Sequence, residues 1–332
     1  MTVASNIKEE ISENTRSKKL NETLIKDLDL KLGEFFSDKI EEFIASLSLK
    51  KEKIEAIGSH GQTIKHEPNS IPPFSLQIGN PQLISNKLGI KTIANFRDDD
   101  IAKGGQGAPL SPIFHKEVFA KMNKKRVIIN IGGITNISLL GGAKLLGFDT
   151  GPGNCLLDIW TKKNKKGNYD NEGNWAKAGT VDQDLLDIMM KDNYFSLEPP
   201  KSTGPDYFNL SWLQDCLMKL KREIDPRDTQ ATLVELTASS LSNSLKRLKI
   251  VNENIYICGG GVHNKFLMRR ISSLLGEKCY TTDKLGLDPD YIEAICFAWL
   301  AYKRVNNIKF NMSAITGSNE KVFLGKVYLP TK

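Results

Sequence analysis

Three strand-like segments follow one another with almost nothing between them, and this feature constrains the fold more than any other. Residues 127–133 (VIINIGG), 134–142 (ITNISLLGG) and 144–151 (KLLGFDTG) are each rich in apolar or β-branched residues and contain glycine at or near their ends. The glycine-containing turns that join them are too short to hold a helix. The segments therefore predict an antiparallel meander.

Around this meander, helix-like and strand-like segments alternate, which predicts an α/β protein. A chain of 332 residues is long enough for two domains of ordinary size. We expect an N-terminal α/β domain at 1–125 and a C-terminal α/β domain with the meander and nucleotide-binding loops at 126–332. Helices are expected at 28–47, 81–89, 155–163, 181–190, 229–248, 265–276 and 291–305, and further strands at 54–60, 75–80, 91–96, 254–258 and 278–283.

The composition is that of a folded protein. Hydrophobic residues make up 40% and charged residues 26% of the chain, which disfavours a disordered or fibrous protein. No apolar run approaches the roughly 20 residues of a membrane helix, and the first residues lack the apolar core of a signal peptide. A cytoplasmic protein is therefore expected. The 5 cysteines are scattered and form no CxxC pair, which argues against a disulfide framework or a zinc site.

The formal net charge of +7 raises the question of an anionic partner. The excess comes largely from lysine clusters at 162–166 and 245–249. A nucleic-acid groove would interleave aromatic residues with Arg and Lys, and these clusters do not. We therefore expect a small phosphorylated ligand, and neither nucleic acid nor a membrane as a partner.

Four strand ends carry glycine where the strand gives way to a turn. They are SHGQT at 59–63, NIGGITN at 130–136, DTGPGN at 149–154 and CGGGVHN at 258–264. Ligands collect at strand ends in open α/β sheets, and glycine lets backbone amides approach phosphate without an intervening Cβ. One such turn is more often a plain hairpin or bulge, but four in one chain predict a nucleotide site.

Asp149 lies near the end of the third meander segment, two residues before a turn of glycine and proline at 151–153. A carboxylate held by a strand, with space and free amides beside it, suits a general base. The same residue would also fit as a cap of the helix that follows, or as a turn residue. From the residues alone, both roles stay open.

Three other groups give weaker indications. His60 and His66 fit local hydrogen bonding near a strand end, and we predict no metal role for them. The charged and then glycine-rich segment 95–109 is either a substrate loop or a solvated surface loop. Glu293 stands at the start of an apolar helix, where it either faces a ligand or complements the helix dipole.

Many motifs occur here in the order of one known family. The resemblance to the bacterial anhydro-N-acetylmuramic acid kinases is close and runs from about residue 28 almost to the C-terminus. It implies the two-domain fold of the actin, hexokinase and Hsp70 superfamily, which is ribonuclease H-like with an interdomain cleft. It also implies a cytoplasmic, homodimeric enzyme of peptidoglycan recycling that uses ATP and Mg²⁺. The strings that carry it are GSHGQTIKHEP, LQIGNPQLI, FRDDDIAKGGQGAPLSPIFH, NIGGITNISLL, FDTGPGN, PPKSTGPDYFN, QATLVELTA, CGGGVHN and the Glu293-Ala294 pair.

The resemblance also implies a reaction and a set of site residues. The enzyme would hydrolyse the 1,6-anhydro bond of anhydro-N-acetylmuramic acid and phosphorylate O6, giving N-acetylmuramic acid 6-phosphate. Asp149 would be the base that activates water for attack on the anomeric carbon. The residues that match the nucleotide loops are Gly132, Gly133, Asn136, Gly259, Gly260, Gly261 and Asn264. The residues expected to contact the sugar are Arg97, Gln106, Gly151 and Glu293, and none is expected to bind a metal.

The sequence departs from this family at its start. Members usually open with a strand, a Gly-Thr-Ser-x-Asp-Gly turn and a second strand, which form the first phosphate loop, and this sequence contains no such motif. The two halves agree with this, because the second has a meander that the first lacks. We expect a first domain without its first strands, an exposed sheet edge, and the missing piece upstream of residue 1. The alternative function is a sugar-binding pseudokinase that is inactive through loss of this loop.

Overall fold

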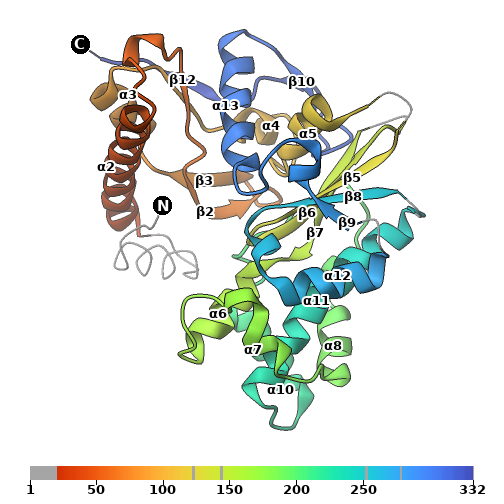
Figure 1. The fold of residues 1–332 in the computed structure, drawn as a ribbon. Coiled ribbons are helices and arrows are strands. Elements are labelled where there is room, and N and C mark those ends of the chain that lie inside the picture. Colours follow the sequence, from red (N-terminus) through yellow and green to blue (C-terminus); the bar gives the residue numbers. More distant parts are fainter. Residues whose placement is uncertain (1–20, 122–123, 143–144, 251–252, 277–278, 332) are drawn as a thin grey trace. The chain divides into compact units, whose positions relative to one another are not determined.

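The computed structural model describes residues 21–121, 124–142, 145–250, 253–276 and 279–331 (Figure 1). The chain forms two compact units. One contains the residues up to Ala108 together with the segment from Ala294 onward, and the other is Pro109–Glu293. The expected domains at 1–125 and 126–332 therefore need correction, because residues 109–125 join the second unit and the C-terminal segment returns to the first.

Two contacts explain these boundaries. Strand β12 (Lys326–Tyr328) pairs antiparallel with β4 (Thr92–Ala94), so the end of the chain completes a sheet of the first unit. Helix α5 (Ser111–Phe119) packs on strand β6 of the second unit, where Pro112 lies so close to Gly147 that a Cβ on that glycine would come within 2.2 Å of it.

The second unit is built, within the described residues, on a five-stranded sheet with the order β7-β6-β5-β8-β9. Strand β6 is antiparallel to β5 and to β7, which confirms the predicted meander. Strand β8 is parallel to β5, and β9 is parallel to β8. This order, with only the second strand reversed, is the ribonuclease H-like arrangement, so the predicted α/β fold is confirmed. The strands are β5 (Arg126–Ile131), β6 (Ile134–Leu140), β7 (Leu146–Pro152), β8 (Asn254–Cys258) and β9 (Cys279–Thr281).

Helices bury the apolar side chains of this sheet. Val127, Ile129 and Ile131 of β5 belong to a core cluster that also contains leucines of α11 and α12. Figure 1 shows α11 and α12 side by side, and they are in contact. Helix α11 begins with Asp225 as its cap and Pro226 at its first turn, a usual start signal. The helices of this unit are α5, α6 (Asn154–Lys163), α7 (Asn174–Lys177), α8 (Gln183–Met190), α9 (Asn193–Ser196), α10 (Leu210–Leu220), α11 (Pro226–Arg247) and α12 (Lys265–Leu275).

The first unit has a smaller sheet with the order β1-β4-β12, in which β1 and β4 are parallel. Within the described residues β1 is therefore an outer strand. The expected loss of the first strands and the exposed edge concern residues 1–20 or their upstream sequence, which lie outside the described residues. The elements of this unit are α2 (Glu22–Ser46), β1 (Ile57–Gly58), β2 (Gln62–Glu67), β3 (Phe74–Ile78), α3 (Pro81–Leu88), β4, α4 (Asp98–Ala102), most of α13 (Ile292–Val305), β10 (Phe310–Asn311), β11 (Lys321–Val322) and β12.

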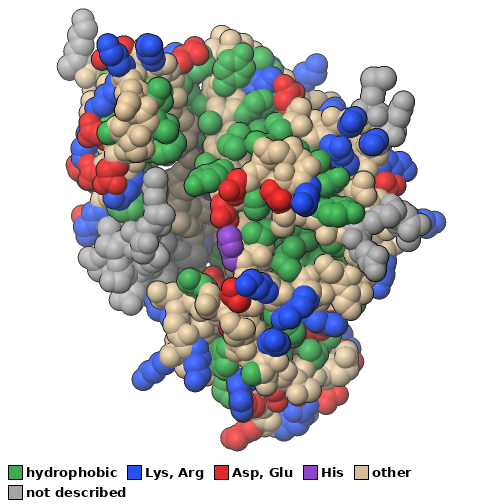
Figure 2. Space-filling model, viewed as in Figure 1, with side chains coloured by type: hydrophobic (Ala, Val, Ile, Leu, Met, Phe, Trp, Pro, Cys, Tyr) green, Lys and Arg blue, Asp and Glu red, His purple; other side chains and the backbone are tan. Residues whose placement is uncertain are grey.

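Two features of the surface bear on the kind of partner. Among the described helices, none combines the length and the apolar character that crossing a membrane would require. On the face that Figure 2 shows, the Lys and Arg side chains are interspersed with acidic and uncharged ones.

Candidate functional site

Three of the four predicted glycine turns meet at one end of the sheet in the second unit. Gly132 and Gly133 form the turn from β5 to β6. The turn from β7 to α6 lies directly on it, because Gly153 N donates to Gly133 O (2.9 Å) and Asn154 N donates to Gly132 O (2.8 Å). Gly133 is exposed, so the turn presents backbone to solvent at the carboxyl end of a central strand, where ligands bind in such sheets.

The third turn follows β8 and packs against the end of β5. A Cβ at Gly259 would come within 2.4 Å of Asn130 Oδ1, and one at Gly261 within 2.3 Å of a methyl carbon of Ile131. Gly259 also has a φ of +83°, which L side chains rarely adopt. The absence of side chains at this turn is thus a packing requirement. The fourth turn, at Gly61, belongs to the first unit.

Asp149 lies inside β7 and is 4% exposed. The segment from Tyr194 to Thr203 contacts it at three points. Thr203 N donates to Asp149 Oδ2 (3.0 Å), the Tyr194 hydroxyl donates to the Asp149 carbonyl (2.7 Å), and Asp149 N donates to Lys201 O (3.2 Å). The N-cap of helix α6 is Gly153, and no side chain caps this helix, so the cap alternative for Asp149 is wrong. The carboxylate is held in one orientation, as a general base requires.

Lys201 is a buried cation in the segment that contacts Asp149. The lysine is 5% exposed, its Nζ donates to Tyr194 O (3.0 Å), and Nζ lies 4.6 Å from the centre of the Tyr194 ring. Loss of water on burial, followed by the charge of Arg247, lowers the pKa of Lys201 to about 8. Tyr194, Lys201 and Thr203 were not predicted as site residues, although Lys201 and Thr203 lie in the PPKSTGPDYFN string.

Asn136, predicted to bind nucleotide, lies next to Asp149 in the sheet. It is the cross-strand partner of Asp149 on β6, and its Oδ1 accepts from Ser111 Oγ (3.2 Å). Opposite residues of antiparallel strands present their side chains to the same face. The backbone N–H and C=O of Asp149 both bond to groups outside the β6–β7 pair, so Asn136 and Asp149 form a non-hydrogen-bonded pair. The side chains of such a pair lie closer together than those of a hydrogen-bonded pair. Asn136 is therefore a close neighbour of Asp149, and its contact with the nucleotide stays a prediction.

Gly151 and Glu293, two of the predicted sugar contacts, lie in the same unit as Asp149. A Cβ on Gly151 would come within 2.8 Å of the Phe195 ring, so close packing alone accounts for this glycine. Glu293 is exposed near the start of α13. Burial, and then the Glu293 carboxylate, raise the pKa of the Cys258 thiol, which places Glu293 near the end of β8.

A pocket of about 560 Å³ adjoins the β8 turn. It is lined by α6, by the segment Tyr169–Glu172 and by residues from Gly260 to the start of α12. Asn264, predicted to bind nucleotide, lines this pocket, but its Oδ1 also caps α12 by accepting from Leu267 N (2.9 Å). The glycine turn and the pocket share Gly260, so one ligand can reach both.

Arg97 and Gln106, the other predicted sugar contacts, lie in the first unit. Arg97 Nη2 lies 3.0 Å from His60 Nε2, and His60 Nδ1 lies 2.9 Å from Gly61 O. His60 must then carry its hydrogen on Nδ1 and accept from Arg97 on Nε2. Burial, followed by the charge of Arg97, lowers the pKa of His60 to about 3, so the ring stays neutral.

Asp100, which sequence analysis did not single out, shapes the loop that carries Gln106. Its buried carboxylate accepts from Gly107 N (2.7 Å) and from Thr316 Oγ1 (2.7 Å), and a Cβ on Gly105 would come within 2.2 Å of it. Burial raises the pKa of this carboxyl. The segment 95–109 is therefore at least partly buried structure, not a simple solvated loop.

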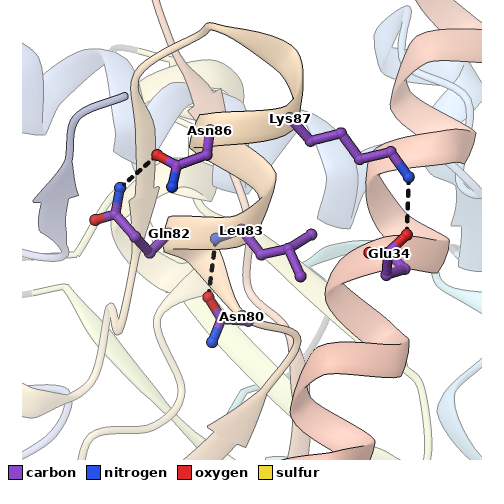
Figure 3. Close-up of a pocket in the computed structure, with 6 residues that line it drawn as sticks. All are labelled: Glu34, Asn80, Gln82, Leu83, Asn86 and Lys87. Carbon is purple, nitrogen blue, oxygen red and sulfur yellow. Dashed lines mark hydrogen bonds and ion pairs between the residues drawn. The ribbon is translucent and has the colours of Figure 1, made fainter. Parts of the chain in front are cut away.

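A second hollow, of about 590 Å³, lies between α2 and α3 in the first unit (Figure 3). The polar side chains that line it are bonded to one another or to backbone. Lys87 reaches Glu34 (2.9 Å), Gln82 donates to Asn86 (2.8 Å), and Asn80 caps α3 by accepting from Leu83 N (2.9 Å). These contacts account for the polar groups without a ligand.

Comparison with known proteins gives a consistent result. A family model described as anhydro-N-acetylmuramic acid kinase matches residues 2–330. A relative with that name from Pasteurella multocida (strain Pm70) is 47% identical over 305 residues, which cover 91% of this chain and 81% of the relative. One from Shewanella sp. (strain ANA-3) is 46% identical, covering 90% and 81%, and one from Haemophilus influenzae (strain ATCC 51907 / DSM 11121 / KW20 / Rd) is 43% identical, covering 91% and 82%.

Proposed function

Because the chain belongs to the anhydro-N-acetylmuramic acid kinase family, and is by that kinship a sugar kinase, we propose that it acts on anhydro-N-acetylmuramic acid with ATP. It would hydrolyse the 1,6-anhydro bond and phosphorylate O6, giving N-acetylmuramic acid 6-phosphate. The observation that carries this proposal is the buried carboxylate of Asp149, fixed by the Thr203 amide in the unit that also gathers three glycine turns.

Asp149 is proposed as the general base. Its carboxylate accepts a proton from water, whose oxygen forms the new bond to the anomeric carbon as the bond from that carbon to O6 breaks. O6, released from the ring, then attacks the γ-phosphorus, and ADP leaves. The Asp149 carboxylate interacts electrostatically with the Lys201 ammonium and opposes, more weakly, the lowering of the Lys201 pKa by burial and by Arg247.

The glycine turns at Gly132–Gly133 and Gly259–Gly261 are proposed to hold the phosphates of ATP through backbone amides. Phosphoryl transfer depends mainly on positioning and charge stabilisation, which such amides supply. The described residues contain no group of three or more His, Cys, Asp and Glu side chains arranged for a metal ion. Mg²⁺ usually binds through substrate phosphates and few carboxylates, so we expect the nucleotide to carry it and its charge to assist the transfer.

The remaining expectations follow from kinship. We propose that Arg97 and Gln106 in the first unit, and Gly151 and Glu293, contact the sugar. Arg97 is held by the neutral His60, which makes it a preorganised cation for the lactyl carboxylate. We further propose a cytoplasmic homodimer that works in peptidoglycan recycling.

A coupled assay of ADP release tests the proposal. Sugar-dependent ADP release is expected from the unaltered chain. Asp149→Asn should lower kcat by about 100-fold or more, because general-base catalysis contributes that much. Asn still accepts from Thr203 N, so the fold should survive, as a denaturation curve would check. The control is Asp187→Asn on the exposed side of α8, which should keep full activity.

Two results would overturn this reading. Full activity of Asp149→Asn would remove the base assignment. Tight binding of the sugar by calorimetry, without ADP release from the unaltered chain, would support the sugar-binding pseudokinase instead.

A further inference from the structure

The pocket beside the β8 turn contains one carboxylate that the fold does not use. Both oxygens of Asp170 accept backbone N–H groups, from Trp175 (2.8 Å) and Ala176 (2.9 Å). Glu172 forms an ion pair with Lys265 (2.5 Å). Asp158, by contrast, makes no hydrogen bond or ion pair with any described residue, although it is half-buried and lines the pocket.

Burial without a partner is energetically unfavourable for a carboxylate. It raises the pKa of Asp158 to about 7, and loss of water is the cause. A ligand that donates hydrogen bonds to the Asp158 carboxylate would replace the hydrogen bonds to water that this carboxylate has lost on burial. Three acidic groups and one lysine line this pocket, so the local charge disfavours phosphate and favours neutral donors such as hydroxyl or amino groups.

The position of Asp158 on α6 indicates which part of a bound nucleotide would donate hydrogen bonds to it. It lies four residues after Asn154 on α6, so the two side chains share one helix face and are separated by about one turn, roughly 5–6 Å. Asn154 itself stands at the glycine turns, since its Nδ2 would lie 4.0 Å from a Cβ on Gly260. If the phosphates of a nucleotide lie at the glycine turns, its ribose lies about one helical turn away from them, and its base lies further away.

We propose that the Asp158 carboxylate accepts hydrogen bonds from the ribose hydroxyls of the bound nucleotide and makes the pocket select ribonucleotides over deoxyribonucleotides. The inference rests on the proposed function, in which the glycine turns bind the phosphates of ATP. It assigns Asp158 as a specificity-determining residue that takes no part in proton transfer at the sugar.

Calorimetric binding of ADP, 2′-deoxy-ADP and 3′-deoxy-ADP tests this without relying on turnover. The unaltered chain should bind at least one deoxy analogue about 10-fold or more weakly than ADP, the loss expected for one hydrogen bond to a charged group. Asp158→Asn should weaken the binding of ADP by a similar factor. It should also reduce the difference in binding between ADP and that deoxy analogue to about 3-fold or less. Asp187→Asn, which alters an exposed carboxylate outside the pocket, should behave like the unaltered chain.

The outcomes are separable. Equal binding of ADP and both deoxy analogues by the unaltered chain, or undiminished discrimination by Asp158→Asn, would overturn the proposal. So would a variant that loses discrimination only against inosine diphosphate, because the contact would then be to the 6-amino group of the base. Nucleotide binding with the expected discrimination but without sugar-dependent ADP release would overturn the kinase reaction alone, and absence of any nucleotide binding would overturn both.

Discussion

Substitution of Tyr194 by Phe would remove one atom from the support of Asp149 and leave the rest in place. The Tyr194 hydroxyl donates to the carbonyl of Asp149 at 2.7 Å, and Tyr194 is 5% exposed. Among the strands that the structure describes, β7 is the outer one of its sheet, so no described strand pairs with this carbonyl. Loss of the hydroxyl from a buried acceptor should lower the free energy of unfolding by about 1–3 kcal/mol.

The aromatic packing should survive this change, because Phe keeps the ring. The ring meets Phe208 edge-on with centroids 5.5 Å apart and lies under the Lys201 ammonium. No large cavity arises, so the decrease in the free energy of unfolding should come from loss of the hydrogen bond. If the segment 194–203 orients the carboxylate, kcat should also fall while the KM for the sugar changes little, since small displacements of a catalytic group are costly.

Urea unfolding and the ADP-release assay would measure both effects. The matched control is Tyr207→Phe, in which the same atom is removed from a tyrosine that is 45% exposed and donates to Asp192 Oδ1 (2.8 Å). That control should change the free energy of unfolding by less than about 0.5 kcal/mol. Equal losses in the two variants, or an unchanged kcat in Tyr194→Phe, would refute the view that this segment supports Asp149.

Two further predictions concern the same unit. Because the pKa of Lys201 falls from 10.5 to about 8 on folding, the unfolded chain binds more protons between these values, and this group makes the free energy of unfolding rise with pH across that window. Lys201→Met should remove this contribution, and an unchanged pH slope in denaturant unfolding would contradict it. Gly259→Ala should cost more stability and more ADP affinity than Gly286→Ala, because a Cβ meets Asn130 at 2.4 Å in the first and nothing within 4 Å in the second. The second should show only the backbone cost of positive φ, about 1 kcal/mol, and equal losses in unfolding experiments would exclude a steric role for Gly259.

The parts of the fold that sequence predicted are those whose signals are local. The meander follows from turns too short for a helix, and α3 ends where Gly89 adopts a φ of +68°. Strand β12 was missed because it has only three residues and gains its structure from β4 at the other end of the chain. Helix α5 was missed because it is buried on several sides, which hides any amphipathic period.

In the candidate site, too, some residues could be predicted from the sequence and others could not. Asp149 and the glycine turns stand out because a carboxylate and side-chain-free positions at strand ends have special chemistry. The hydrogen bonds that Lys201 and Thr203 make with Asp149 use their backbone atoms, which no residue type reveals. Asp158 lies in a segment that reads simply as a helix, and only the packing around it distinguishes it from a surface acid.

The pairing of β12 with β4 has a consequence for how the chain is made. A sheet that takes its outer strand from residues 326–328 cannot be completed on the ribosome until these residues have been synthesised. The Pro109–Glu293 unit draws its sheet from a continuous stretch and is free to form earlier. Deletion of residues 326–328 should therefore destabilise the unit that contains the residues up to Ala108, which are encoded far upstream in the gene.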